Sequence, residues 1–167
     1  WNPRSLSSTA VSASKAKPCS MQIDFSQPCV MAVLNVTPDS FYAGSRTPDA
    51  GAVERRVRAC LDEGAAIIDV GGYSSRPGAD EVSPAEEWRR VAAGLEVVRR
   101  LAPGLPVSVD TFRASVVRSA VGRFGKVIVN DISAGELDAE MLPTVAQLGV
   151  PYVAMHMKGD PRTMQSL

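Results

Sequence analysis

Short, largely apolar runs alternate along the chain with longer segments in which apolar residues recur every three or four positions. The runs are rich in valine and isoleucine and are only a few residues long, which is typical of buried strands. This pattern predicts five strands, at residues 30–34, 66–70, 107–110, 127–130 and 152–155.

The segments between these runs carry the signals of amphipathic helices. Ser83 and Glu86 form a capping box, in which we expect the serine to accept from a free amide and the glutamate to reach back. Gly149 is placed to end another helix. We expect four helices: one opening at 47–48 and closing at 64, one from 83 to 102, one around 116–121 and one over 141–148.

Apolar strands separated by helices predict an α/β fold with a parallel sheet that helices cover. Each strand–helix unit takes roughly 20 to 40 residues, which fits either a barrel or a doubly wound sheet. No predicted strand is followed by a G-x-G-x-x-G turn, so the sequence disfavours the dinucleotide-binding version of the doubly wound fold.

The first 28 residues differ from the rest. They are rich in serine and alanine and carry no acidic residue before Asp24, so they bury little apolar surface to offset the entropy of ordering. We expect residues 1–28 to be a disordered arm or linker; a transit peptide would also fit this composition. The chain begins with Trp1, and we expect it to be a piece of a longer protein.

Composition narrows the classes of function. The 167 residues carry 18 basic and 18 acidic side chains, so the surface lacks the field that gathers nucleic acid or anionic lipid. No apolar run approaches the roughly 20 residues that span a bilayer. Three cysteines and one histidine do not form a zinc motif, which indicates free thiols in a cytoplasmic protein. We therefore expect neither nucleic-acid nor membrane partners.

Polar side chains gather where the predicted strands end. Because active sites of parallel barrels lie at the carboxyl ends of the strands, a polar ligand shared by these side chains is one interpretation. The other is that an aspartate such as Asp110 or Asp131 caps the helix that follows it. The strand-end residues are Asn35, Asp69, Asp110, Asn130, Asp131 and His156.

Two loops add further chemistry. Residues 35–41 (NVTPDSF) offer amide, hydroxyl and carboxylate oxygens, which suit a hard cation such as Mg²⁺. Residues 71–78 (GGYSSRPG) combine glycines with hydroxyls and an arginine, a composition that suits phosphate. Each loop is only a moderate signal, because glycine and serine are also common in turns.

Taken in order, five strings resemble the successive motifs of the dihydropteroate synthase family. The resemblance runs from residue 29 to the end of the chain, and five ordered motifs are far more specific than any one loop. The strings are residues 35–41 (NVTPDSF), 69–78 (DVGGYSSRPG), 108–111 (SVDT), 130–133 (NDIS) and 155–157 (MHM).

The resemblance implies a (β/α)8 TIM barrel, of which residues 29–167 would supply roughly the first five βα units. It implies condensation of 4-aminobenzoate with 6-hydroxymethyl-7,8-dihydropterin diphosphate in folate biosynthesis, with release of diphosphate and competition by sulfonamides. It also implies Mg²⁺ as cofactor, Asn35 as its ligand, and a homodimer for the full-length protein.

The family's site residues are carried over position by position. Arg76 and Asp110 are expected to be catalytic, and Asn35 to contact Mg²⁺ and the diphosphate. The pterin ring is expected to meet Asp110, Asn130, Ile132 and Met155. The aminobenzoate pocket is expected to form from two mobile loops that carry Phe41, Ser75, Arg76 and Pro77.

Three positions depart from the family pattern, and so does the length. Ala43 lacks a carboxylate common in the first loop, Ser75 replaces a frequent threonine, and Asp160 replaces another. A complete barrel takes roughly 250 residues, so we expect this chain alone to be a poor enzyme. The alternatives are an inactive pterin-binding fragment and a pterin-dependent methyltransferase domain; a sugar-phosphate barrel enzyme is disfavoured, because no strand ends in a catalytic lysine or glutamate.

Overall fold

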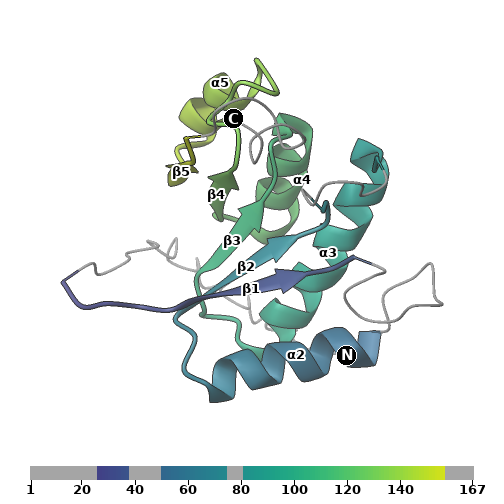
Figure 1. Ribbon diagram of the computed structural model, residues 1–167, viewed down its shortest axis with the longest axis vertical. Helices are drawn as coiled ribbons and strands as arrows, with labels where there is room; N and C mark the ends of the chain where they lie inside the picture. Colours follow the sequence, from purple (N-terminus) through teal and green to yellow (C-terminus); the bar gives the residue numbers. More distant parts are fainter. Residues whose placement is uncertain (1–25, 38–49, 75–80, 157–167) are drawn as a thin grey trace, which may run out of the picture.

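The computed structural model describes residues 26–37, 50–74 and 81–156 (Figure 1). Within these ranges the elements alternate strictly between strand and helix after β1. In chain order they are β1 (Met31–Asn35), α2 (Ala50–Asp62), β2 (Ile67–Gly71), α3 (Pro84–Leu101), β3 (Val107–Asp110), α4 (Ala114–Phe124), β4 (Ile128–Asp131), α5 (Met141–Leu148) and β5 (Tyr152–Ala154).

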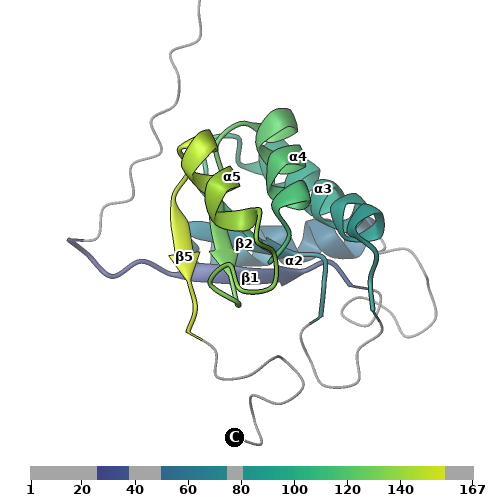
Figure 2. The same cartoon turned by 90° about the horizontal axis from the view of Figure 1, so that it is seen from above.

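The five strands form one parallel sheet in the order β1-β2-β3-β4-β5. A parallel crossover is right-handed almost without exception, so strands that always advance in one direction place their helices on one face. Figure 2 shows the helices gathered on one side of the sheet. This one-sided, sequential winding is that of a TIM barrel, and about five of its strand–helix units are described.

The main core lies between the sheet and the helix layer. It joins alternate strand residues, such as Leu34 and Val70, to the apolar stripes of α2, α3 and α4. Gly94 lets α3 approach closely: a Cβ there would stand 2.7 Å from Val70 Cγ1 and 2.9 Å from Val36 Cγ2. The alternate strand residues that face away from the helices include Val33 and Val153, which are exposed.

Local signals in the sequence account for most element ends. Ser83 accepts from the Glu86 N–H at 3.2 Å, as the capping box predicts, and Gly149 ends α5 in the left-handed conformation. The Glu86 carboxylate does not reach back to Ser83, however. It pairs with Arg89 at 2.7 Å and Arg90 at 2.8 Å, because these arginines lie one turn along the same helix face.

Two predictions fall largely outside the described residues. The opening of the first helix at residues 47–48 is one, and α2 is described only from residue 50. The other is the arm at residues 1–28, of which only residues 26–28 are described, so it stays a prediction. Among the described helices, none has the length and apolar character required to cross a membrane.

Candidate functional site

One row of residues crosses the sheet at the carboxyl ends of its strands. The strand register aligns Asn35 with Gly71, Gly71 with Asp110, and Asp110 with Asn130. Side chains in one row of a parallel sheet point to the same face, and here that face lies opposite the helices. The structure therefore brings together three of the predicted site residues, Asn35, Asp110 and Asn130, on one rim.

Gly71 leaves the space between two of these side chains open. A Cβ at this position would stand 3.3 Å from Oδ1 of Asn35 and 3.3 Å from Oδ2 of Asp110. Both polar groups therefore flank the same glycine, and the missing side chain gives a ligand access to the backbone between them.

The Asp110 carboxyl group has no hydrogen-bond partner among the described residues, although the residue is only partly exposed. Burial, followed by the charges of three nearby acids, raises the pKa of Asp110 to about 7; these acids are Asp69, Glu87 and Asp131. A carboxyl group in this state is poised to gain from a ligand that offers a hydrogen-bond donor or a positive charge.

Asn130 is tied to a second acid below the rim. Its Nδ2 donates to Oδ2 of Asp69 at 3.0 Å, and Asp69 is 3% exposed. Burial raises the pKa of Asp69, and the hydrogen bond from the Asn130 amide offsets part of that effect. The sequence marked Asp69 as a strand-end residue but did not assign it a role.

Asp131 stabilises the fold and is not one of the rim residues. Alternation along β4 turns it away from Asn130, and its buried carboxylate accepts four hydrogen bonds of 2.8 to 2.9 Å. The donors are the N–H and hydroxyl of Ser133, the N–H of Gly135 and the hydroxyl of Tyr152. The interpretation of a ligand shared by the strand-end residues therefore does not extend to Asp131, whose hydrogen bonds fix the loop after β4.

The remaining predicted residues divide into two groups. Ile132 follows β4 and is partly buried, and Met155 follows β5 and is 38% exposed, so both lie at the rim end of the sheet. His156 comes next and is exposed. The predicted loop residues lie outside the described ranges, and these are Phe41, Ser75, Arg76 and Pro77.

Sequence reasoning missed a buried ionic cluster beside the rim. Glu87 on α3 is completely buried, accepts from the Thr111 hydroxyl and pairs with Arg113 at 2.6 Å. The Arg113 guanidinium also lies over the rings of Tyr73 and Phe112, 5.3 Å and 5.0 Å from their centroids. The available signal was an acid four residues before Val91, inside the apolar stripe of α3.

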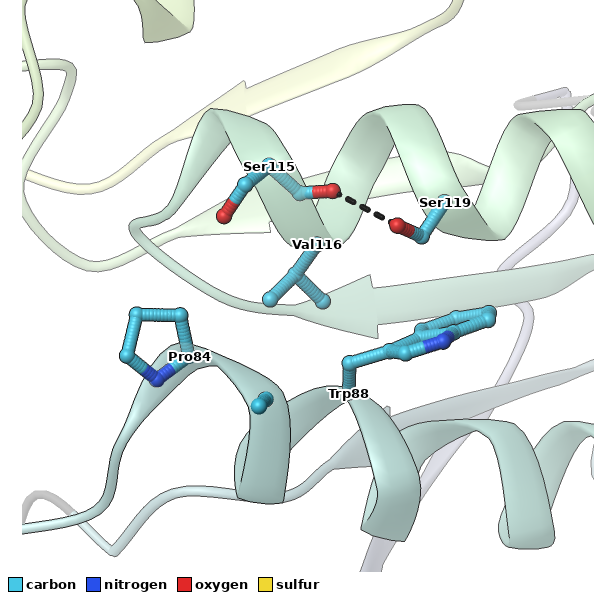
Figure 3. Close-up of a pocket in the computed structure, with 6 residues that line it drawn as sticks. Pro84, Trp88, Ser115, Val116 and Ser119 are labelled. Carbon is cyan, nitrogen blue, oxygen red and sulfur yellow. Dashed lines mark hydrogen bonds between the residues drawn. The ribbon is translucent and has the colours of Figure 1, made fainter.

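A groove in the helix layer lies apart from the rim. Figure 3 shows it between α3 and α4, with Trp88 facing Val116 and the Ser119 hydroxyl donating to the Ser115 carbonyl at 3.0 Å. Its walls come from helix residues alone and contain no titratable group. It is therefore a packing groove between helices and does not enlarge the candidate site.

The described residues contain no group of three or more His, Cys, Asp or Glu side chains placed to hold a metal ion. Asn35 nevertheless presents an exposed amide oxygen at the rim. One oxygen ligand fits a cation such as Mg²⁺, which usually keeps several waters and takes its remaining ligands from substrate phosphates.

Comparisons with known proteins agree with this geometry. The family described as pterin binding enzyme matches residues 31–167. The chain is 47% identical over 143 residues to an Arabidopsis thaliana mitochondrial folate synthesis bifunctional protein, covering 82% of this chain and 25% of that one. It is 41% identical over 138 residues to dihydropteroate synthase of a Synechocystis strain, covering 83% and 47%.

Solved structures give the same result. Xanthomonas albilineans dihydropteroate synthase with 4-aminobenzoic acid matches with a TM-score of 0.71 and 43% identity, over 80% of this chain and 48% of that one. The Yersinia pestis enzyme in a sulfonamide drug complex matches with a TM-score of 0.74 and 36% identity, over 87% and 51%. The matched part of the chain thus covers between a quarter and about half of the length of these relatives. The family match, the similar solved structures and the parallel sheet with its polar rim agree, and the chain belongs to the pterin-binding enzyme family.

Proposed function

We propose that the protein is a dihydropteroate synthase, which joins 4-aminobenzoate to 6-hydroxymethyl-7,8-dihydropterin diphosphate and releases diphosphate. The observation that carries this proposal is the rim on which Asn35, Asp110 and Asn130 stand in register, with Asp110 unpaired among the described residues. The relatives named dihydropteroate synthase share this part of the chain at 41–46% identity.

The pterin half of the site is assigned to Asp110 and Asn130. The Asp110 carboxylate and the carbonyl oxygen of the Asn130 amide are both acceptors, so the pair can match neighbouring N–H groups of a pterin. Ile132 and Met155 supply apolar surface at the same end of the sheet for the flat ring. An ionised Asp110 would also favour the positive charge that grows on the pterin methylene as diphosphate leaves.

The diphosphate half is assigned to Asn35 and Arg76. Asn35 would hold Mg²⁺ through its amide oxygen, and the bound cation would neutralise charge on the leaving diphosphate. Arg76, which lies outside the described residues, would meet the same anion through its guanidinium. The amine of 4-aminobenzoate then needs correct placement more than a strong base, because the carbon that it attacks is already electrophilic.

The aminobenzoate pocket belongs to the same proposal. Phe41, Ser75 and Pro77 would line it, with Arg76, and sulfonamides would compete there. The full-length protein would be a cytoplasmic homodimer. No observation favours the methyltransferase or the inactive fragment over the synthase, since the named relatives and solved structures cited above are folate-synthesis proteins.

The test is an assay of the complete gene product for diphosphate release from the pterin substrate. We expect release to require both Mg²⁺ and 4-aminobenzoate, and Asn130→Ala to lower kcat/KM at least about tenfold. Ser119→Ala, in the groove between α3 and α4, is the matched control and should leave the rate unchanged. Failure to form dihydropteroate from the two substrates in the presence of Mg²⁺ would overturn the proposal.

A further inference from the structure

On the basis of the proposed pterin site, we infer that Asp69 is a positioning residue: its carboxylate fixes which edge of the Asn130 amide faces the ligand. Asp69 touches no substrate in this proposal. It acts through Asn130, and the inference assigns to the pair a preference for a ligand edge rich in N–H donors.

The contact spans a strand. Asp69 is on β2 and Asn130 is on β4, with β3 between them, yet Nδ2 of Asn130 lies 3.0 Å from Oδ2 of Asp69. Strands two places apart in a flat sheet are separated by roughly 9 to 10 Å. The two side chains meet because the sheet curls toward the face opposite the helices, as a barrel requires.

The chemistry of the two groups sets the orientation of the amide. An ionised carboxylate has acceptors only, so Asn130 must turn its NH₂ group toward Asp69. The Asn130 carbonyl oxygen then faces the rim, where Asp110 presents a second acceptor in the adjacent register position. Two neighbouring acceptors suit a ligand edge with two neighbouring N–H donors, such as an amino group beside a ring N–H.

Packing alone does not explain an acid at this position. Oδ1 of Asp69 and Oγ of the neighbouring Ser108 are both buried without a hydrogen-bond partner. An unsatisfied buried polar atom costs free energy, and apolar residues such as Val33 and Ile128 share this face. A valine at position 69 would avoid the cost at Asp69 Oδ1, so packing alone does not account for a carboxylate there, whereas its contact with Asn130 does.

The experiment separates the acceptor from the charge. Asp69→Asn removes the charge but keeps an acceptor, whereas Asp69→Val removes both, and the part of their difference that disappears with Asn130→Ala reports the contact to Asn130. Binding of 6-hydroxymethyl-7,8-dihydropterin to the complete gene product is measured by calorimetry for both variants, each with and without Asn130→Ala. Ser108→Ala, which removes the neighbouring hydroxyl, is the matched control.

We expect Asp69→Asn and Ser108→Ala to bind within about threefold of the parent protein, because an amide at position 69 still pairs with Asn130. Asp69→Val should bind about tenfold more weakly than Asp69→Asn. With Asn130→Ala present, Asp69→Val and Asp69→Asn should differ in affinity by less than about twofold, because the amide with which residue 69 pairs is absent. If Asp69→Val does not fold, the shorter Asp69→Ser takes its place.

The outcomes separate this inference from the function on which it rests. A parent protein that does not bind the dihydropterin would overturn the proposed function. A parent protein that binds it, while the acceptor has no effect or has the same effect without Asn130, would overturn the role of Asp69 alone.

Discussion

Arg113, in the loop after β3, pairs at 2.6 Å with Glu87 on α3, whose side chain is completely buried. Thr111, directly after the rim residue Asp110, donates its hydroxyl to the same carboxylate. Burial raises the pKa of Glu87, and the contacts to Thr111 and Arg113 counter that effect. The cluster therefore attaches the rim end of β3 to the helix layer.

Removing one partner of this buried pair should strongly destabilise the protein. Glu87→Ala leaves Arg113 without its ion pair in a largely buried position, and we expect a loss of about 3 kcal/mol in the free energy of unfolding. Denaturant titration of the complete gene product measures it. Glu96→Ala, which breaks an exposed pair with Arg123, is the control and should cost far less. Equal losses would contradict the assignment.

Asp110 should make stability fall as the pH rises. Its pKa is about 7 in the folded protein against an ordinary value of 3.8, so between these values the folded state holds a proton that the unfolded state has released. The free-energy cost of ionising Asp110 in the folded protein is therefore absent below the ordinary pKa of 3.8 and complete above about pH 7. Asp110→Asn should therefore be more stable than the parent at about pH 8, by on the order of 2 kcal/mol, with a smaller difference at about pH 5. A difference that does not change with pH would count against the raised pKa.

The same carboxyl should make pterin affinity depend on pH in the opposite sense. If ionised Asp110 accepts a hydrogen bond from the ligand, then below about pH 7 the carboxyl group must lose its proton before the ligand binds. Affinity should therefore weaken by up to tenfold for each pH unit below about pH 7. Calorimetry with 6-hydroxymethyl-7,8-dihydropterin avoids the titration of the diphosphate itself. Asp110→Asn should abolish the slope between about pH 6 and about pH 8, and a slope that persists would assign it to another group.

A methyl group at Gly71 should weaken binding without unfolding the protein. In Gly71→Ala the new Cβ would stand 3.3 Å from both Asn35 Oδ1 and Asp110 Oδ2, so both side chains must shift by a few tenths of an ångström. We expect about tenfold weaker dihydropterin binding, since misplaced polar contacts cost roughly a hydrogen bond. Gly122→Ala in α4, where a Cβ meets nothing within 4 Å, is the control and should bind normally. Normal binding by both variants would show that the space above Gly71 is not used.

The sequence predicted the elements well because their signals are local. The apolar stripe of α3 and the valine-rich runs predicted α3 and the five strands to within one residue at each end, and β3 matches its predicted range, whereas α4 extends three residues beyond its predicted end. The rim followed from the rule that parallel strands end at one edge. By contrast, Glu87 and Arg113 are 26 residues apart and meet only through the packing of α3 beside β3. No local pattern encodes such a contact.

Asn130 and Asp131 show where the rim prediction reached its limit. Both end β4, and alternation requires that they face opposite sides. Strand periodicity alone does not say which of the two faces the helices. The register with Asp110 decides it in favour of Asn130 as the rim residue, and Asp131 then meets Tyr152 and the loop that follows β4.

Replacing Asp131 should therefore reduce the stability of the protein, whereas replacing Asp110 should reduce its affinity for pterin. Asp131→Ala leaves four hydrogen-bond donors without the buried carboxylate that accepts from them, so we expect a loss of about 3 kcal/mol in the free energy of unfolding. Asp131→Asn should also destabilise, because an amide has one acceptor oxygen where the carboxylate has two. Asp110→Asn, which loses no hydrogen bond within the described residues, should be at least as stable as the parent and lose pterin affinity. Paired denaturation and calorimetry on the complete gene product would measure both effects. Were Asp131→Ala to unfold like the parent and bind pterin poorly, then Asp131 would be the ligand residue and Asp110 would not.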